Sequence, residues 1–307
     1  MHHTLEKKLI LGTAQWGWNV DKQEAFQILD AWMEAGQMEV DAATNYPINR
    51  NPDDFRRSEQ ILLEYIKVHG LSDLRVTMKI GSLDNMRGPE VNLAPSFVQM
   101  LGEEYTRLFG ANLSCLMFHW DNREEPAAIG ASLEALVRFC NTSGLQPGLS
   151  GIAHPERYAQ ALLPMRDYHF NIEVKHNLVQ SDFERYKPLW GQGHRFWVYG
   201  INAGGLKLDA HYHETSTLAR RGGPSEKSAA LIAQLNGFLP QWNQSARPPI
   251  RNMNEIGLLY AVMNQALHGV IVGVSSATQL RETLTYYRHL QSFDYSDVFE
   301  ALQHLNH

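Results

Sequence analysis

The chain contains little cysteine. Among its 307 residues only Cys115 and Cys140 are cysteines, too few for a disulfide framework, and the pair lacks the spacing of metal ligands. No apolar run approaches the ~20 residues needed to cross a bilayer, and the start MHHTLEKK lacks the apolar core of a signal peptide. We therefore expect reduced thiols, no membrane partner and a cytoplasmic location.

Positive charge is also scarce. The 27 Lys and Arg residues are outnumbered by 33 Asp and Glu, the net charge is −6, and no basic run with interleaved aromatics occurs. This argues against a nucleic acid or an anionic membrane as partner. The 14 histidines form no HExxH or similar short motif, so no metal site is predicted. A small-molecule ligand is the favoured partner, and nothing in the composition indicates an oligomeric state.

What the chain does contain is a regular alternation of two kinds of segment. Apolar, β-branched runs begin near residues 9, 38, 74, 113, 148, 169, 195 and 269. Stretches of helical length lie at 22–35, 57–69, 95–109, 129–141, 155–163, 182–190, 254–267 and 278–290. This alternation is typical of an α/β protein whose parallel strands close into a barrel. We therefore predict a single (β/α)8 domain of the TIM type over residues 1–307.

One segment interrupts the alternation. Residues 204–249 are too long for a simple connection and include a helical stretch at 225–239. We predict a long insertion after the seventh strand. Because long loops after barrel strands often cover the active site, it is either a lid or a peripheral addition. The tail from residue 296 predicts one more helix, which closes over the barrel.

Four polar residues stand near the carboxyl ends of successive predicted strands. Asp41 and Tyr46 lie in VDAATNYP, Lys79 in VTMKIG and His119 in LMFHWD. In a barrel these positions converge at the carboxyl-terminal mouth, where barrel enzymes keep their active sites. Taken singly, each residue has an ordinary structural explanation, as a helix cap, a rim charge or core packing. Their joint position on neighbouring strands favours an active site.

These residue types suit proton transfer to a carbonyl oxygen. A tyrosine hydroxyl has an ordinary pKa of about 10, and a nearby ammonium lowers that pKa by stabilising the phenolate. We therefore predict that Tyr46 is a general acid/base tuned by Lys79, and that Asp41 keeps the lysine charged. We expect His119 to orient the carbonyl or to share in the proton transfer.

The same motifs resemble those of the aldo-keto reductase family. LGTAQWGW resembles its first-strand motif, VDAATNYP its Asp-Thr-Ala-x-x-Tyr stretch, VTMKI its Thr-Lys strand end and LMFHWD its Leu-x-His-x-x-Asp segment. The resemblance implies an NAD(P)H-dependent oxidoreductase that interconverts an aldehyde, ketone or sugar carbonyl and an alcohol by hydride transfer. It assigns the nicotinamide to Ser150, Glu173 and Tyr199, and the cofactor's ribose to Gly12 and Thr13.

Two positions depart from the family pattern around the nicotinamide. Gly151 stands where many relatives have Asn, and Glu173 stands where they usually have Gln. An ionised glutamate accepts a hydrogen bond from the carboxamide nitrogen but cannot donate one to its oxygen. The sequence therefore predicts a weaker grip on the nicotinamide than in those relatives.

The cofactor's 2′-phosphate is the second region of departure. Gly273 and Gln279 replace the Lys and Arg of many relatives. We predict that the segment from Gly273 to Thr283 binds there, with Ser275 and Gln279 as hydrogen-bonding groups at the amino end of a helix. NADP(H) is the preferred cofactor, and NAD(H) is the alternative because neutral hydrogen bonds attract a phosphate less than charged ones do.

Trp16, Trp18 and Trp120 are the candidate walls of the substrate pocket. Aromatic walls suit sugars as well as aryl or alkyl aldehydes, and the alternative for Trp16 and Trp18 is packing at the barrel mouth. Two other functions stay open at this point. One is a cofactor-binding interaction subunit with weak activity, and the other is a barrel lyase in which Lys79 forms a Schiff base.

Overall fold

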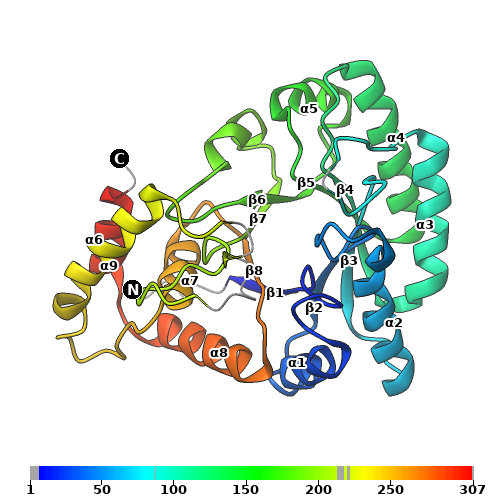
Figure 1. Cartoon of the computed structure of the whole chain (residues 1–307). Coiled ribbons are helices and arrows are strands. Elements are labelled where there is room, and N and C mark those ends of the chain that lie inside the picture. The colour runs from blue at the N-terminus through cyan, green and yellow to red at the C-terminus, as the bar shows by residue number, and fades with distance from the viewer. Residues whose placement is uncertain (1–6, 87, 213–217, 220–221, 306–307) are drawn as a thin grey trace.

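Eight parallel strands form a closed barrel in the computed structural model, which describes residues 7–86, 88–212, 218–219 and 222–305 (Figure 1). The strands are β1 (Lys8–Gly12), β2 (Glu39–Ala43), β3 (Arg75–Ile80), β4 (Leu113–His119), β5 (Gln146–Ser150), β6 (Asn171–Lys175), β7 (Arg195–Tyr199) and β8 (Gly269–Val272). Each strand pairs with the next along the chain, and β8 pairs with β1 to close the ring. The predicted (β/α)8 barrel is confirmed.

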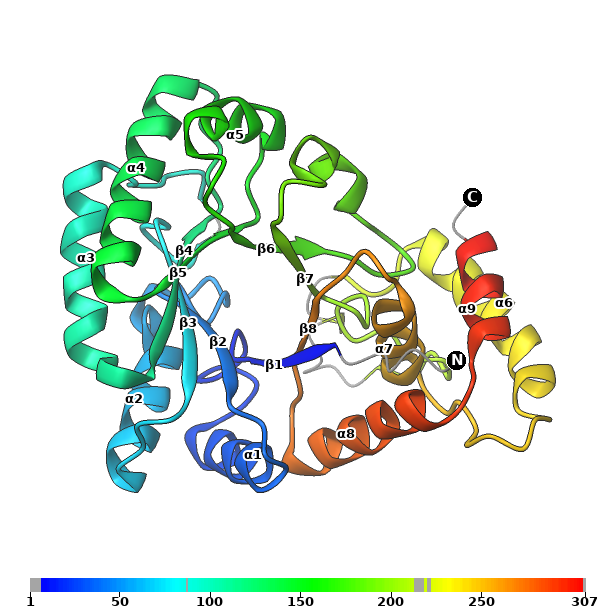
Figure 2. The ribbon, with the colours of Figure 1, turned by 180° about the vertical axis from the view of Figure 1, so that it is seen from behind.

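Helices surround the barrel on its outside, as the view from behind also shows (Figure 2). They are α1 (Lys22–Glu34), α2 (Arg57–His69), α3 (Pro95–Phe109), α4 (Pro126–Ser143), α5 (Pro155–Ala161), α7 (Met253–Met263) and α8 (Ala277–Ser292). The segment Phe183–Leu189 is a 3-10 helix, so the prediction of an ordinary helix at 182–190 was wrong in type. It contains Pro188, which lacks the N–H that an α-helix would use there.

Local signals in the sequence explain where these helices begin and end. The Asp21 side chain accepts from the backbone N–H of Glu24 and caps α1. Proline occupies the first turn of α3, α4 and α5, where its missing N–H is not needed. Gly70 and Gly144 end α2 and α4 in the left-handed conformation that glycine adopts without strain.

The insertion after β7 contains α6 (Glu226–Trp242), and the C-terminal tail forms α9 (Ser296–His304). Both views show α6 and α9 side by side at the edge of the molecule (Figures 1 and 2). Just after α6, Arg247 Nη2 donates to Asp297 Oδ2 at 2.8 Å, and the Tyr295 hydroxyl donates to the carbonyl of Pro248 at 2.7 Å. The end of the insertion, at Arg247 and Pro248, is therefore hydrogen-bonded to the start of the C-terminal helix.

The core has two parts. A large apolar cluster fills the space between the strands and the surrounding helices. A smaller cluster fills the barrel interior and consists of Ile10, Cys115, Met117, Trp197 and Ile271. Apolar side chains thus close the barrel interior, so ligand chemistry is confined to the strand ends.

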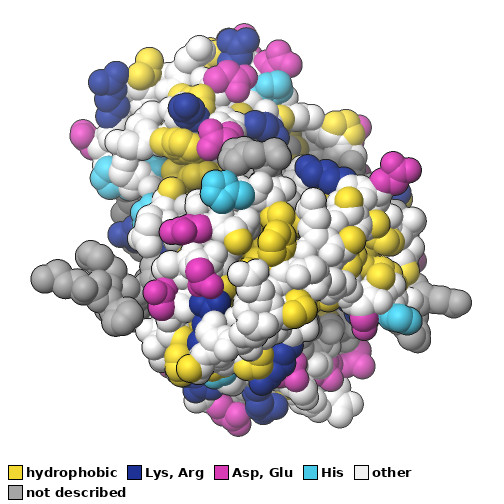
Figure 3. Space-filling model, turned by 90° about the vertical axis from the view of Figure 1, so that its left-hand side faces the viewer, with side chains coloured by type: hydrophobic (Ala, Val, Ile, Leu, Met, Phe, Trp, Pro, Cys, Tyr) yellow, Lys and Arg dark blue, Asp and Glu magenta, His cyan; other side chains and the backbone are white. Residues whose placement is uncertain are grey.

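The surface carries both signs of charge. On the face that Figure 3 shows, acidic and basic side chains are interspersed. Within residues 7–86, 88–212, 218–219 and 222–305, no helix is both long enough and apolar enough to cross a bilayer.

Candidate active site

Polar side chains lie at or near the carboxyl-terminal ends of five neighbouring strands of the barrel. Asp41 lies in β2, and Lys79 lies in β3 opposite Ala43 of β2. The register then pairs His119 of β4 with Ser150 of β5, and Ser150 with Glu173 of β6. Because parallel strands present their ends at one edge, the barrel brings together residues that lie far apart in the sequence.

An ammonium group lies between two carboxylates at the centre of this layer. Lys79 Nζ donates to Asp41 Oδ1 at 2.8 Å, to Asp41 Oδ2 at 2.6 Å and to Glu173 Oε2 at 3.0 Å. No more than 2% of the surface of any of the three residues is exposed. Its two carboxylate partners raise the pKa of Lys79 well above its ordinary value, against the lowering effect of burial, so the lysine stays charged.

Tyr46 lies beside this ammonium. Lys79 Nζ is 5.0 Å from the centroid of the Tyr46 ring, and the rings of Tyr46 and His119 meet edge to face at 5.9 Å. Burial raises the pKa of Tyr46, and the positive charge of Lys79 opposes this effect without overcoming it, so the net shift is opposite to the lowering that the sequence led us to predict. The hydroxyl is therefore protonated at neutral pH.

His119 is held as a neutral imidazole. Burial, followed by the charge of Lys79, lowers its pKa well below the ordinary value. Its Nδ1 is buried and has no hydrogen-bond partner among the described residues. We refer to Asp41, Tyr46, Lys79, His119 and Glu173 as the strand-end cluster.

Around this cluster, Ser150 and Glu173 contact each other directly. Ser150 Oγ donates to Glu173 Oε2 at 2.9 Å, the same oxygen that Lys79 reaches. Glu173 Oε1 is buried and has no partner in the part of the chain that the structure describes. Tyr199 follows at the end of β7 and is partly buried. An acceptor oxygen of Glu173 is therefore available to a ligand next to Ser150 and Tyr199.

Gly12 and Thr13, at the end of β1, have a visible structural role. Thr13 is fully buried, and its hydroxyl donates to the Asp41 carbonyl at 2.9 Å. Ser58 donates to both oxygens of Thr13 at 2.9 Å. A side chain at Gly12 would meet Ile271 Cγ2 at 2.9 Å. These residues hold the backbone of Asp41 in place.

The three candidate pocket tryptophans occupy different environments. Trp16 is fully buried in the large core cluster, which favours the packing alternative for this residue, whereas Trp18 is partly exposed. The Trp120 ring lies 4.6 Å from that of His119. A Cβ atom at Gly151 would lie 2.6 Å from Trp120 Cδ1. Glycine at position 151 therefore makes room for the indole beside His119.

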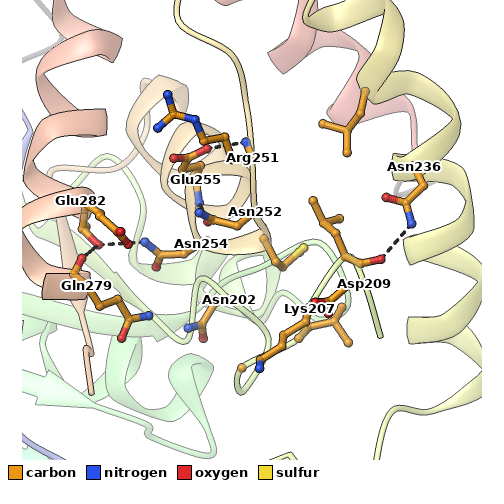
Figure 4. Close-up of a pocket in the computed structure, with 16 residues that line it drawn as sticks. Asn202, Lys207, Asp209, Asn236, Arg251, Asn252, Asn254, Glu255, Gln279 and Glu282 are labelled. Carbon is orange, nitrogen blue, oxygen red and sulfur yellow. Dashed lines mark hydrogen bonds between the residues drawn. The ribbon is translucent and has the colours of Figure 1, made fainter. Parts of the chain in front are cut away.

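A cavity of about 620 Å³ opens between the loop after β7 and the starts of α7 and α8 (Figure 4). Gln279 and Thr283, two of the predicted cofactor residues, line it. Ser275 donates to Gln279 Oε1 through its backbone N–H at 2.8 Å and its hydroxyl at 3.1 Å. A Cβ atom at Gly273 would meet nothing within 4 Å. The predicted segment thus borders open space.

Comparison with known proteins decides the family. The model of the aldo/keto reductase family matches residues 8–303. The chain belongs to the aldo/keto reductase family. Membership supports an NAD(P)H-dependent oxidoreductase acting on small-molecule carbonyl substrates.

Individual proteins are also similar to this chain. The holo form of the aldo-keto reductase AKR11C1 from Bacillus halodurans superposes with a TM-score of 0.70 over 97% of this chain and 91% of that chain, at 16% identity, and shows the same fold. An uncharacterized 11.2 kDa protein in the crtE 3' region of Pseudescherichia vulneris is 33% identical over 76 residues, which cover 24% of this chain and 74% of the relative.

The cavity contains charged residues that the sequence patterns did not indicate. Lys207 from the loop after β7 and Arg251 before α7 line it, together with the carboxylates of Asp209, Glu255 and Glu282. Glu255 Oε2 accepts from the backbone N–H of Arg251 at 2.5 Å. Their position in the sequence could have indicated a ligand-binding role, because loops after the last barrel strands commonly bind phosphate.

These residues fit a dinucleotide of the kind that the family uses. In the strand-end cluster, Glu173 Oε1 is an acceptor without a partner among the described residues. The cavity is lined by Gln279 and by the cationic side chains of Lys207 and Arg251. Among the residues that the structure describes, no group of three or more His, Cys, Asp or Glu is placed to hold a metal ion.

Proposed function

We propose that the chain interconverts a small-molecule carbonyl and an alcohol by hydride transfer, with Tyr46 as the general acid/base. The observation that supports this most strongly is the position of a protonated, buried tyrosine beside a fixed ammonium and a neutral histidine. A bound NAD(P)H would supply the hydride, and Glu173, Ser150 and Tyr199 would hold its nicotinamide end.

In this proposal the proton comes from the chain itself. As hydride reaches the carbonyl carbon, Tyr46 donates its hydroxyl proton to the carbonyl oxygen. The phenolate that remains is stabilised by the charge of Lys79, which is an electrostatic effect of the kind that is strongest in a dry site. Asp41 keeps Lys79 charged and in place through two hydrogen bonds.

His119 would orient the substrate. A neutral imidazole carries one N–H, which can donate to the carbonyl oxygen without competing for the proton of Tyr46. Trp120, packed on His119, and the partly exposed Trp18 offer aromatic surface. Such surface suits sugars and aryl or alkyl aldehydes.

For the cofactor we propose NADP(H). Lys207 and Arg251 line the cavity beside Gln279, and cationic side chains favour a 2′-phosphate. NAD(H) is the second candidate, because Asp209 and Glu282 line the same cavity and a carboxylate can hydrogen-bond an unphosphorylated ribose.

The Schiff-base alternative for Lys79 conflicts with its environment. An amine must be unprotonated to attack a carbonyl. Here the carboxylates of Asp41 and Glu173 keep the lysine protonated, and they accept its N–H groups. The second alternative, an interaction subunit with weak activity, differs from our proposal in the rate of turnover.

One experiment tests the proposal. The purified protein is titrated with NADPH and with NADH while tryptophan quenching is followed, and a panel of aldehydes, ketones and aldoses is then assayed by the loss of reduced-nicotinamide absorbance. We expect tighter binding of NADPH and turnover of members of the panel. Binding without turnover would favour the interaction subunit, and failure of both cofactors to bind would refute the proposal.

A further inference from the structure

The strand-end cluster contains more negative than positive charge. Asp41 and Glu173, which we call the acidic pair, share the single ammonium of Lys79 at 2.6 and 3.0 Å. If both carboxylates are ionised, the three buried groups carry one net negative charge. A buried charge without a partner is costly, so this arrangement favours taking up either a proton or a cationic ligand.

Four further ionisable side chains near the acidic pair are neutral. Burial and Lys79 keep His119 neutral by lowering its pKa, and burial raises the pKa of Tyr46, Tyr199 and Cys115, so that they are neutral as well. Burial and then the charge of Glu173 raise the pKa of Asp41 well above its ordinary value. Asp41, whose carboxyl group lies with that of Glu173 on the single ammonium of Lys79, is therefore the member of the pair on which we place the proton.

We propose that Glu173 makes the site select the oxidised over the reduced nicotinamide and couples that choice to one proton on the acidic pair. This inference rests on the proposed function. An oxidised nicotinamide ring carries one positive charge, whereas the reduced ring is neutral. The oxidised ring balances the net charge of the cluster, and the reduced ring leaves it unbalanced unless the acidic pair holds a proton.

The position of Glu173 supports a direct effect on the ring. Its Oε2 is occupied by Lys79 and Ser150, whereas its buried Oε1 has no partner among the described residues. Glu173 therefore has both a charge and an acceptor to offer a ligand. Selection of the oxidised form by this carboxylate stabilises the bound state of oxidised cofactor and alcohol relative to that of reduced cofactor and carbonyl.

The proposal makes a defined prediction about protons. Binding of the oxidised cofactor to protein with a protonated acidic pair releases one proton to solvent, and binding of the reduced cofactor to protein with an unprotonated pair takes one up. As the pH rises, affinity for the oxidised form therefore increases and affinity for the reduced form decreases. Removal of the Glu173 charge abolishes both trends.

The test compares the full-length wild-type chain with Glu173→Gln, which keeps the shape of the side chain. Dissociation constants of the oxidised and reduced cofactor are measured by tryptophan quenching between about pH 5 and about pH 9. The number of protons exchanged comes from calorimetry in two buffers with different ionisation enthalpies. In the variant at the upper end of this pH range we expect oxidised-cofactor affinity to fall on the order of tenfold or more and reduced-cofactor affinity to exceed that of wild type.

Glu39→Gln is the matched control. It also removes one carboxylate from the barrel, but at the amino-terminal end of β2, where Glu39 pairs with Lys8 at 2.6 Å and Arg75 at 2.8 Å. We expect this variant to keep the wild-type ratio of the two dissociation constants and its pH dependence.

The outcomes separate the inference from the proposed function. If wild type binds both cofactor forms and Glu173→Gln keeps the same ratio and pH dependence, the inference is overturned and the proposed function stands. If wild type binds neither form, the proposed function fails and the inference fails with it. Should Glu173→Gln not fold, the wild-type proton count decides, because binding of both forms without proton release or uptake at any pH tested overturns the inference.

Discussion

Lys79→Met removes the ammonium that lies between the two buried carboxylates. Methionine keeps a side chain of similar length but loses the hydrogen bonds to Asp41 at 2.8 and 2.6 Å and to Glu173 at 3.0 Å. Removing one partner from a buried ion pair costs about 3–5 kcal/mol, because the other charge stays buried without compensation. Here two carboxylates are left behind, so we expect the free energy of unfolding to fall by about 5 kcal/mol near pH 8.

The loss should depend on pH in a definite direction. Burial and Glu173 already raise the pKa of Asp41, and removal of the opposing Lys79 charge raises it further. A carboxyl group whose pKa is higher in the folded than in the unfolded state destabilises the fold as the pH rises above its unfolded value of about 3.9. The deficit of the variant is therefore smallest near about pH 4 and grows towards neutral pH.

Urea unfolding at several pH values measures this effect. The control is Lys22→Met, which breaks a half-exposed ion pair with Glu64 at 2.8 Å and should cost less than about 1 kcal/mol. If Lys79→Met is as stable as Lys22→Met near pH 8, or if its deficit does not change with pH, the account of the buried cluster is refuted.

Further outcomes are expected at other positions. Tyr46→Phe abolishes turnover but leaves the dissociation constants of NADPH and NADH within about threefold of wild type in tryptophan quenching, because it removes the acid and not the cofactor contacts. Gly151→Ala lowers the free energy of unfolding in urea by about 2 kcal/mol and shifts tryptophan emission, because its methyl group would meet Trp120 at 2.6 Å. Gly144→Ala, with a similarly positive φ but open space, costs about 1 kcal/mol. Burial lowers the pKa of His194 to about 4, so the stability that this neutral histidine contributes is present above about pH 6.5 and is lost as the pH falls towards 4. In His194→Gln the unfolding free energy should depend less steeply on pH between about 4 and 6.5. An unchanged pH dependence would contradict the assignment of this effect to His194.

Much of the fold could be predicted because its signals are local. The eight apolar runs form the eight strands, and the periodic stretches between them form helices. Several of these helices begin at a proline or end at a glycine. The exception at Phe183–Leu189 is short, and at that length tertiary contacts outweigh helical propensity.

The site was less accessible to prediction, because its contacts join distant parts of the chain. Lys79 and Glu173 are separated by 94 positions, and no pattern in either segment indicates that they form an ion pair. Lys207 and Arg251 lie in irregular segments, where charged residues are ordinarily solvated and carry no periodic signal. Trp16 was predicted to line the substrate pocket because it lies near the end of the first strand. That position does not determine whether the side chain faces the barrel mouth or the core.

The loop between β8 and α8 is folded onto its own helix. Ser275 bonds to the Gln279 side chain, and the Ser276 side chain caps the first turn of α8. A ligand reaching this loop meets groups whose conformational entropy was already lost during folding, so little further ordering accompanies binding. We therefore expect association at this end of the cavity to be limited by diffusion and desolvation rather than by loop closure.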